Sequence, residues 1–142
     1  MENMKPRRGI NGRRGAFQLV ESVVYLIVGT GFMLAPATPA REKAFSWLTE
    51  HIPLEWFAAL WILAGAIAIW SAFRPRPKDA PGFMALVAAP GVWAVLYFLS
   101  AAITNAPLNA VQGAIYGALG ALPLIVAGMT GPRDRDHREA AQ

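Results

Sequence analysis

The stretch "GAFQLVESVVYLIVGTGFMLAP" fills residues 15–36 and contains one charged side chain, Glu21, in an otherwise apolar run. At a rise of 1.5 Å per residue, about 20 such residues cross a hydrocarbon core of ~30 Å. A charged group at the centre of a bilayer costs about 2.5–3.5 kcal/mol on insertion scales. The stretch therefore predicts a first membrane span in which Glu21 marks a face turned towards other helices.

Three more apolar segments of similar length follow, and the four predicted spans are 16–35, 54–73, 82–103 and 107–129. The chain has 142 residues, of which 55 % are hydrophobic and 15 % are charged, and the charges collect between and outside these segments. A soluble helical domain would instead distribute its charges along amphipathic helices. The sequence predicts an all-α integral membrane four-helix bundle over residues 16–129, with polar tails at 1–15 and 130–142.

The connection between the first two spans predicts a short amphipathic surface helix over residues 39–52. Thr38 can cap its N-terminus, and Pro39 suits the first helical position. Phe45, Leu48 and Ile52 share one face of this helix. Two placements fit the pattern: the helix lies on the outer leaflet, or it covers the end of the bundle as a lid.

The distribution of basic residues predicts the orientation. Eleven of the 13 Lys and Arg residues lie in the N-terminal tail, the connection between the second and third spans, and the C-terminal tail. Only Arg41 and Lys43 lie on the other side. The positive-inside rule then places both termini in the cytoplasm of a bacterial cell, with the spans in the inner membrane. This topology accounts for the pI near 10, so we expect no nucleic-acid partner.

Polar side chains form one stripe on the first span and one on the last. The two polar stripes are Gln18, Glu21, Ser22 and Tyr25, and Asn105, Asn109, Gln112 and Tyr116. One interpretation is that these groups hydrogen-bond across packed helices. The other is that both stripes face a common axis, within one bundle or between subunits, and line a wet path.

Small residues recur at four-residue spacing on the second and fourth spans, where they allow helices to approach closely. The predicted helix-packing residues are Ala64, Ala68, Ala72, Gly113, Gly117 and Gly120. We expect these faces to support self-association.

Glu21 allows two interpretations. It forms an ion pair at the cytoplasmic mouth, with Arg14, Arg74, Arg76 or Arg133 as candidate partners, or it handles a proton or cation. A proton relay needs a second titrating group at depth, and the other spans contain no Asp, His, Lys or Arg.

Tryptophans divide into two kinds by position. Trp56 and Trp70 lie near the two ends of the second span, where indole rings favour the headgroup region. Trp61 and Trp93 lie deeper and are predicted to be packing residues.

Enzyme chemistry has no recognisable motif in this sequence. The chain has no cysteine, and its histidines, His51 and His137, lie outside the spans and far apart. No nucleophile motif, phosphate-binding loop or metal-spaced cluster is present. We expect no enzymatic activity, no cofactor and no metal site.

The chain resembles small four-span membrane proteins encoded by phages of actinobacteria. The resemblance rests on "LVESVVYLIVGTGFMLAP", "PAREKAFSWL", "IPLEWFAALWILAGAIAI" and "GFMALVAAPGVWAVLYFLSA", which together cover about residues 19–102. It implies a holin-like protein that oligomerises in the host inner membrane and permeabilises it. The alternative is a non-conducting membrane interaction module, for superinfection exclusion or for anchoring a partner protein. No functional residue carries over from the family.

Overall fold

The computed structural model describes residues 9–35 and 38–129, and in this part of the chain the only regular secondary structure is helical, with no strand. Its five helices are α1 (Gly12–Leu34), α2 (Pro39–Thr49), α3 (Leu54–Ala72), α4 (Ala80–Thr104) and α5 (Pro107–Met129). Every helix except α2 is long and apolar enough to cross a membrane. The predicted all-α fold class is confirmed, and the chain is built as a multi-pass membrane protein.

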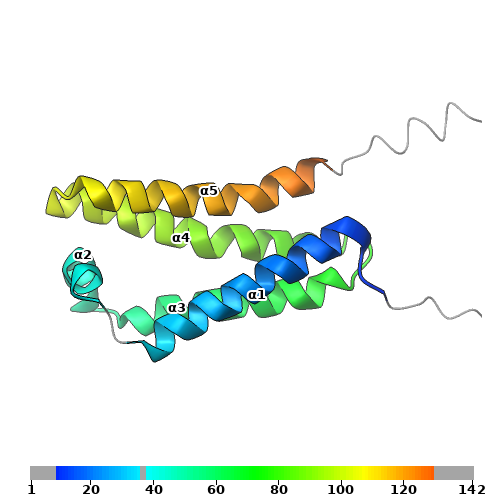
Figure 1. Cartoon of the computed structure of the whole chain (residues 1–142), viewed down its shortest axis with the longest axis horizontal. Coiled ribbons are helices and arrows are strands. Elements are labelled where there is room, and N and C mark those ends of the chain that lie inside the picture. Colours follow the sequence, from blue (N-terminus) through cyan, green and yellow to red (C-terminus); the bar gives the residue numbers. More distant parts are fainter. Residues whose placement is uncertain (1–8, 36–37, 130–142) are drawn as a thin grey trace, which may run out of the picture.

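The four long helices run side by side, each antiparallel to the next (Figure 1). Helix α1 packs mainly on α3, α5 packs mainly on α4, and the contact between α3 and α4 joins the two pairs. Helix α1 begins and α5 ends at the same end of the bundle, beside the 73–79 turn, and we call this the tail end (Figure 1). The opposite end, where α2 lies, is the lid end.

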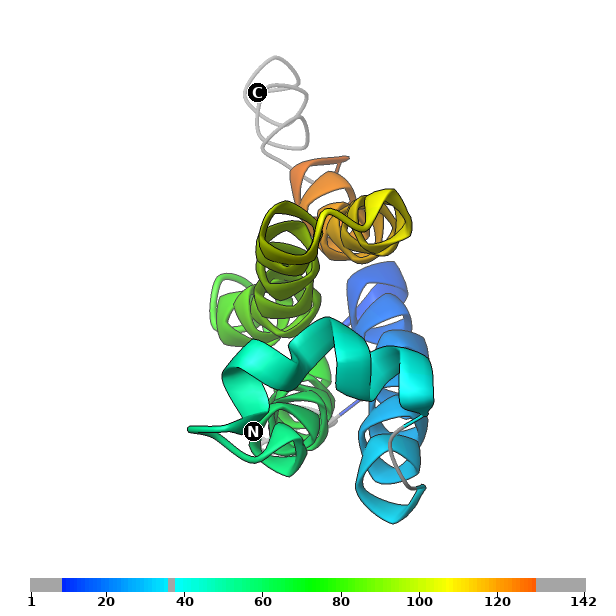
Figure 2. The ribbon, with the colours of Figure 1, turned by 90° about the vertical axis from the view of Figure 1, so that its left-hand side faces the viewer.

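Helix α2 lies across the lid end rather than alongside the other helices (Figure 2). Thr38 caps it and accepts a hydrogen bond from the Arg41 backbone N–H, and Pro39 occupies the first turn, as predicted. Phe45 is fully buried against Trp93 and Tyr97, at ring-centroid distances of 5.7 and 4.8 Å. Of the two predicted placements, the structure therefore shows the lid. Helix α2 ends at Thr49, three residues before the predicted end.

The long helices differ from the predicted spans by a few residues at their ends. Helix α1 begins at Gly12, before the predicted residue 16, because Arg14 is buried in the fold instead of belonging to a solvated tail. Asn105 lies outside the last helix: it ends α4 in the left-handed conformation, with φ of 50°. Asn tolerates this conformation at a helix C-terminus. The next helix, α5, begins at Pro107.

Glycines on both partners bring α1 and α3 into close contact. A Cβ at Gly15 would lie 2.5 Å from the Ala72 carbonyl oxygen, and one at Gly29 would lie 3.0 Å from that of Ala58. Gly65 does the same from α3, where a Cβ would lie 3.1 Å from the Ser22 carbonyl oxygen. Small residues at such contacts let two membrane helices gain van der Waals packing along their backbones.

The centre of the bundle is filled by aromatic rings. Trp61 of α3 and Trp93 of α4 are fully buried, which confirms that they are packing residues. Trp56 and Trp70 are 73 % and 52 % exposed on the outside of α3, and indole rings at such positions favour the headgroup region.

Candidate functional site: a buried ion pair, two polar stripes and an aromatic plug

An ion pair is buried at the tail end. The Nε of Arg14 on α1 donates to Asp79 Oδ2, just before α4, over 2.7 Å, and the side-chain exposures are 10 % and 2 %. Asn11 Nδ2 donates to the same oxygen over 3.1 Å. An ion pair removed from water is stable only when further hydrogen bonds satisfy it, and Asn11 supplies one of them.

Further contacts extend this cluster to every long helix. Gln18 Nε2 donates to the Asp79 carbonyl oxygen over 2.9 Å, and Arg14 donates to the Ala127 carbonyl oxygen of α5 over 3.0 Å. The Asn11 backbone N–H donates to the carbonyl oxygen of Ala72, the last residue of α3. We call Asn11, Arg14, Gln18 and Asp79 the tail-end cluster. It joins α1 to α3, to the start of α4 and to α5.

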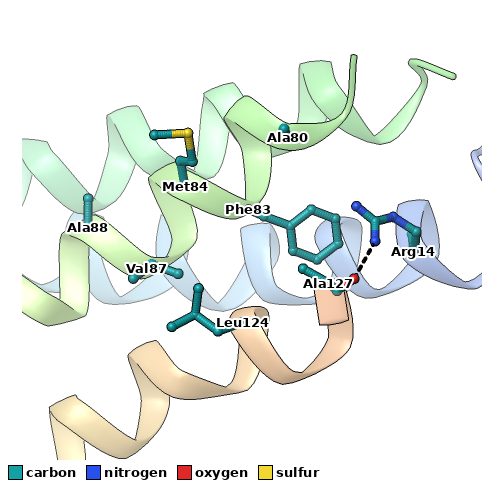
Figure 3. A pocket seen from close by; sticks show the side chains of 8 residues that line it. All are labelled: Arg14, Ala80, Phe83, Met84, Val87, Ala88, Leu124 and Ala127. Carbon is teal, nitrogen blue, oxygen red and sulfur yellow. Dashed lines mark hydrogen bonds between the residues drawn. The ribbon is translucent and has the colours of Figure 1, made fainter. Parts of the chain in front are cut away.

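A pocket of about 370 Å³ lies beside the tail-end cluster, between α4 and α5. Figure 3 shows the Arg14 guanidinium at one end of the pocket, where it donates a hydrogen bond to the Ala127 carbonyl oxygen. The rest of the lining is apolar. The Arg14 guanidinium also lies over the Phe83 ring, 4.4 Å from its centroid. The lining residues are Arg14, Ala80, Phe83, Met84, Val87, Ala88, Leu124 and Ala127. Such a lining offers apolar contact and contains no nucleophile or acid–base pair.

The first polar stripe faces the bundle interior. Gln18, Ser22 and Tyr25 are fully buried. The Ser22 hydroxyl donates to the Gln18 carbonyl oxygen within α1, and the Tyr25 hydroxyl donates to the Leu86 carbonyl oxygen of α4 over 2.6 Å. A buried hydroxyl left without a partner is costly, and the Tyr25 bond satisfies its hydroxyl while joining α1 to α4.

The second polar stripe is divided between the lid and the surface of α5. Asn109 donates to Ser100 Oγ over 2.9 Å, and Ser100 donates to the Ala44 carbonyl oxygen of α2 over 2.6 Å. Tyr116 stacks on Tyr97, with ring centroids 5.5 Å apart. Gln112 is exposed. This stripe fastens α5 to α4 and, through Ser100, to the lid.

Aromatic rings separate the two stripes. The Trp61 ring contacts Tyr25 on one side and Tyr116 on the other, at centroid distances of 4.7 and 5.9 Å. Trp93 lies 6.0 Å from Tyr116. We call Trp61 and Trp93 the aromatic plug. Because both side chains are fully buried, the stripes do not line a common polar route inside a single chain.

The small residues singled out in the sequence fall into two groups. Ala64, Ala68 and Ala72 are buried inside the bundle. A Cβ at Gly113 would lie 3.1 Å from the Ala94 carbonyl oxygen, and one at Gly120 would lie 3.4 Å from that of Val87. These residues therefore pack within the chain.

Gly117 differs from its neighbours on α5. It is exposed, and a Cβ there would meet only the Ala94 Cβ, at 3.9 Å. Of the small residues predicted on α5, Gly117 is the one with room beside it for another chain.

Arg14, the first candidate partner of Glu21, pairs with Asp79 instead. Glu21 Oε2 is buried and has no hydrogen-bond partner within residues 9–35 and 38–129. Arg74, another candidate partner, lies over the Trp70 ring, 3.3 Å from its centroid. Arg133 lies outside the described residues.

Sequence reasoning missed Asp79 and, with it, the tail-end cluster. Asp79 is the acidic residue in the basic turn "RPRPKDAPG". Because antiparallel neighbours bring this turn back to the start of α1, its acid meets Arg14. The signal available in the sequence was a single carboxylate among three basic residues in the turn between two spans.

Comparison with family models, with curated proteins and with solved structures gives no match to this chain. Within the part of the chain that the structure describes, no three His, Asp or Glu side chains gather where they could hold a metal ion.

Proposed function

We propose that the chain resides in the bacterial cytoplasmic membrane with both termini in the cytoplasm. Eleven of its 13 Lys and Arg residues lie in the tails and in the connection between α3 and α4, which supports this orientation under the positive-inside rule. A reporter fused after Gln142 that is active only inside the cell would agree. Activity of a periplasm-specific reporter at that position would reverse the orientation.

For its activity, we propose a non-conducting membrane interaction module, of the kind that a phage uses to exclude a second phage or to anchor a partner protein. The observation that supports this proposal is the closed interior, in which the aromatic plug separates the polar stripes. Gln18 and Tyr25 of α1 donate their hydrogen bonds inside the chain, and the outward faces of α1 and α4 are apolar. Apolar outward faces suit contact with lipid or with another membrane-embedded chain, and cannot line a water-filled pore.

A holin-like activity is the second candidate, and one feature of α5 favours it. Helix α5 packs mainly on α4 alone, and it presents Gln112 and Gly117 on its exposed surface. Gln112 lies about 140° around α5 from Gly117 at 100° per residue, so copies that associate through Gly117 in a ring would keep the Gln112 amides off the contact itself, where they could face a space that the ring encloses. A polar lining would then form between subunits, outside the closed interior of each one.

Controlled expression in an actinobacterium, with membrane potential followed by a voltage-sensitive dye, separates the two candidates. The interaction module leaves potential and growth unchanged at high expression. A holin-like protein causes a sudden loss of potential after a delay. Gly117→Leu is the matched variant, because it fills the exposed face of α5 without entering the bundle. If the wild type collapses the potential and G117L does not, the holin-like activity replaces the interaction module.

A further inference from the structure

A second pocket, of about 420 Å³, lies at the lid end between α2, α4 and α5. Unlike the pocket at the tail end, it is lined by polar side chains, among them Arg41, Asn109 and Gln112. Leu108 and Val111 form its apolar edge and are 78 % and 54 % exposed on the outside of α5. One wall of the pocket is thus polar, and the other continues into the surface that faces lipid.

Arg41 is the cation of this pocket. It is half-buried in the first turn of α2, and its guanidinium lies over the Phe32 ring, 4.3 Å from the ring centroid. Within the described residues, no carboxylate lies within ion-pair distance of Arg41. Glu55 lines a neighbouring pocket on another side of Arg41 without pairing with it. A guanidinium held by a ring and lacking a carboxylate is available to an anion.

The depth of the pocket matches the headgroup region of a bilayer. Helix α5 begins at Pro107, so Asn109 and Gln112 lie about 3 and 8 Å below its start at 1.5 Å per residue. The exposed Trp56, in the first turn of α3, also lies at the lid end, and indole rings favour that region. A lipid phosphate lies at this level, while its acyl chains extend along α5.

We infer that this pocket binds the phosphate of an anionic phospholipid headgroup. Arg41 contacts the phosphate oxygens and the Gln112 amide donates to the headgroup, while Leu108 and Val111 contact the start of an acyl chain. Arg and phosphate form charge-assisted, often bidentate hydrogen bonds. The site depends on the chain being in a membrane, and on neither candidate activity.

The test uses the full-length chain in detergent, with bound lipid counted by native mass spectrometry. The probes are dioleoyl phosphatidylglycerol and dioleoylglycerol, which share acyl chains and differ in the phosphate-containing headgroup. We expect one phosphatidylglycerol per chain, bound at least tenfold more tightly than dioleoylglycerol. Arg41→Gln should weaken phosphatidylglycerol binding by about tenfold or more, since hydrogen bonds to charged groups contribute roughly this much.

Lys43→Gln is the matched control, because it removes an exposed cation from the same helix. We expect K43Q to bind phosphatidylglycerol as the wild type does. Equal losses in R41Q and K43Q would reveal general charge attraction and overturn the site, and so would equal binding of the two probes. If inorganic phosphate alone binds as tightly as phosphatidylglycerol and displaces it, the ligand is free phosphate instead of a lipid. Each readout is a binding ratio, so any loss of basal stability in R41Q does not obscure it.

Discussion

Arg14 and Asp79 are separated by 65 positions in the chain, yet they meet over 2.7 Å at the tail end of the bundle. The pair connects the first turn of α1 to the residue that precedes α4, two helices that otherwise make few contacts. Through Ala127, Arg14 also holds the last turn of α5. One guanidinium thereby fastens both helix pairs to each other where the chain enters and leaves the bundle.

Removing the Arg14 charge should destabilise the bundle strongly. Arg14→Gln leaves the Asp79 carboxylate buried without its cation, which costs about 3–5 kcal/mol in comparable buried pairs. The measurement is the free energy of unfolding in detergent micelles, obtained by titration with sodium dodecyl sulfate and followed by circular dichroism.

The neighbouring Arg13 provides the control for this prediction, because it is exposed on the same turn of α1. Arg13→Gln should change the free energy of unfolding by less than about 0.5 kcal/mol, as surface substitutions do. Similar losses in R14Q and R13Q would mean that the ion pair contributes nothing beyond general charge.

Two glycines on α1 should respond in opposite directions to substitution by alanine. A Cβ at Gly29 would lie 2.7 Å from Ile62 Cγ1 and 3.0 Å from the Ala58 carbonyl oxygen, whereas a Cβ at Gly31 meets nothing within 4 Å. Gly29→Ala should therefore lower the free energy of unfolding by about 1–3 kcal/mol through overpacking. Gly31→Ala should leave it unchanged or raise it by up to about 1 kcal/mol, because alanine is the better helix former. The same detergent titration measures both, and a tolerated G29A would disprove the close contact of α1 with α3.

Glu21→Gln should stabilise the chain. Its Oε2 is buried without a partner in the described residues, and a neutral amide costs less than a carboxylate in an apolar setting. We expect a gain of about 1 kcal/mol in the free energy of unfolding, against no change for Glu50→Gln at the exposed end of α2. A loss of similar size in E21Q would restore the ion-pair interpretation and call for a search for its cation.

The sequence was sufficient to predict the helices but not the contacts that hold them together. Membrane spans depend on the summed apolarity of about 20 residues, which no single neighbour can overturn, and the N-terminal cap of α2 depends on Thr38 and Pro39 alone. The pairing of Arg14 with Asp79 depends on the packing order of the helices, which decides which turn lies beside the start of α1. The close contact at Gly29 depends on the crossing of α1 with α3. In a chain this rich in alanine and glycine, a single glycine gives no local signal that a helix crosses there.

Replacing a buried tryptophan of the aromatic plug should lower the free energy of unfolding far more than replacing an exposed tryptophan. Trp61→Ala or Trp93→Ala removes a fully buried ring between the two polar stripes, and large-to-small changes of this kind cost about 3–5 kcal/mol. Trp56→Ala, on the outer surface of α3, should cost far less.

In liposomes, the interaction module predicts that the wild type is impermeable to protons and that W93A, with its ring lost beside Tyr116, leaks if it stays folded. A proton flux through the wild type that equals the flux through W93A would show that Trp93 closes nothing, and the closed interior would then no longer argue against a conducting protein.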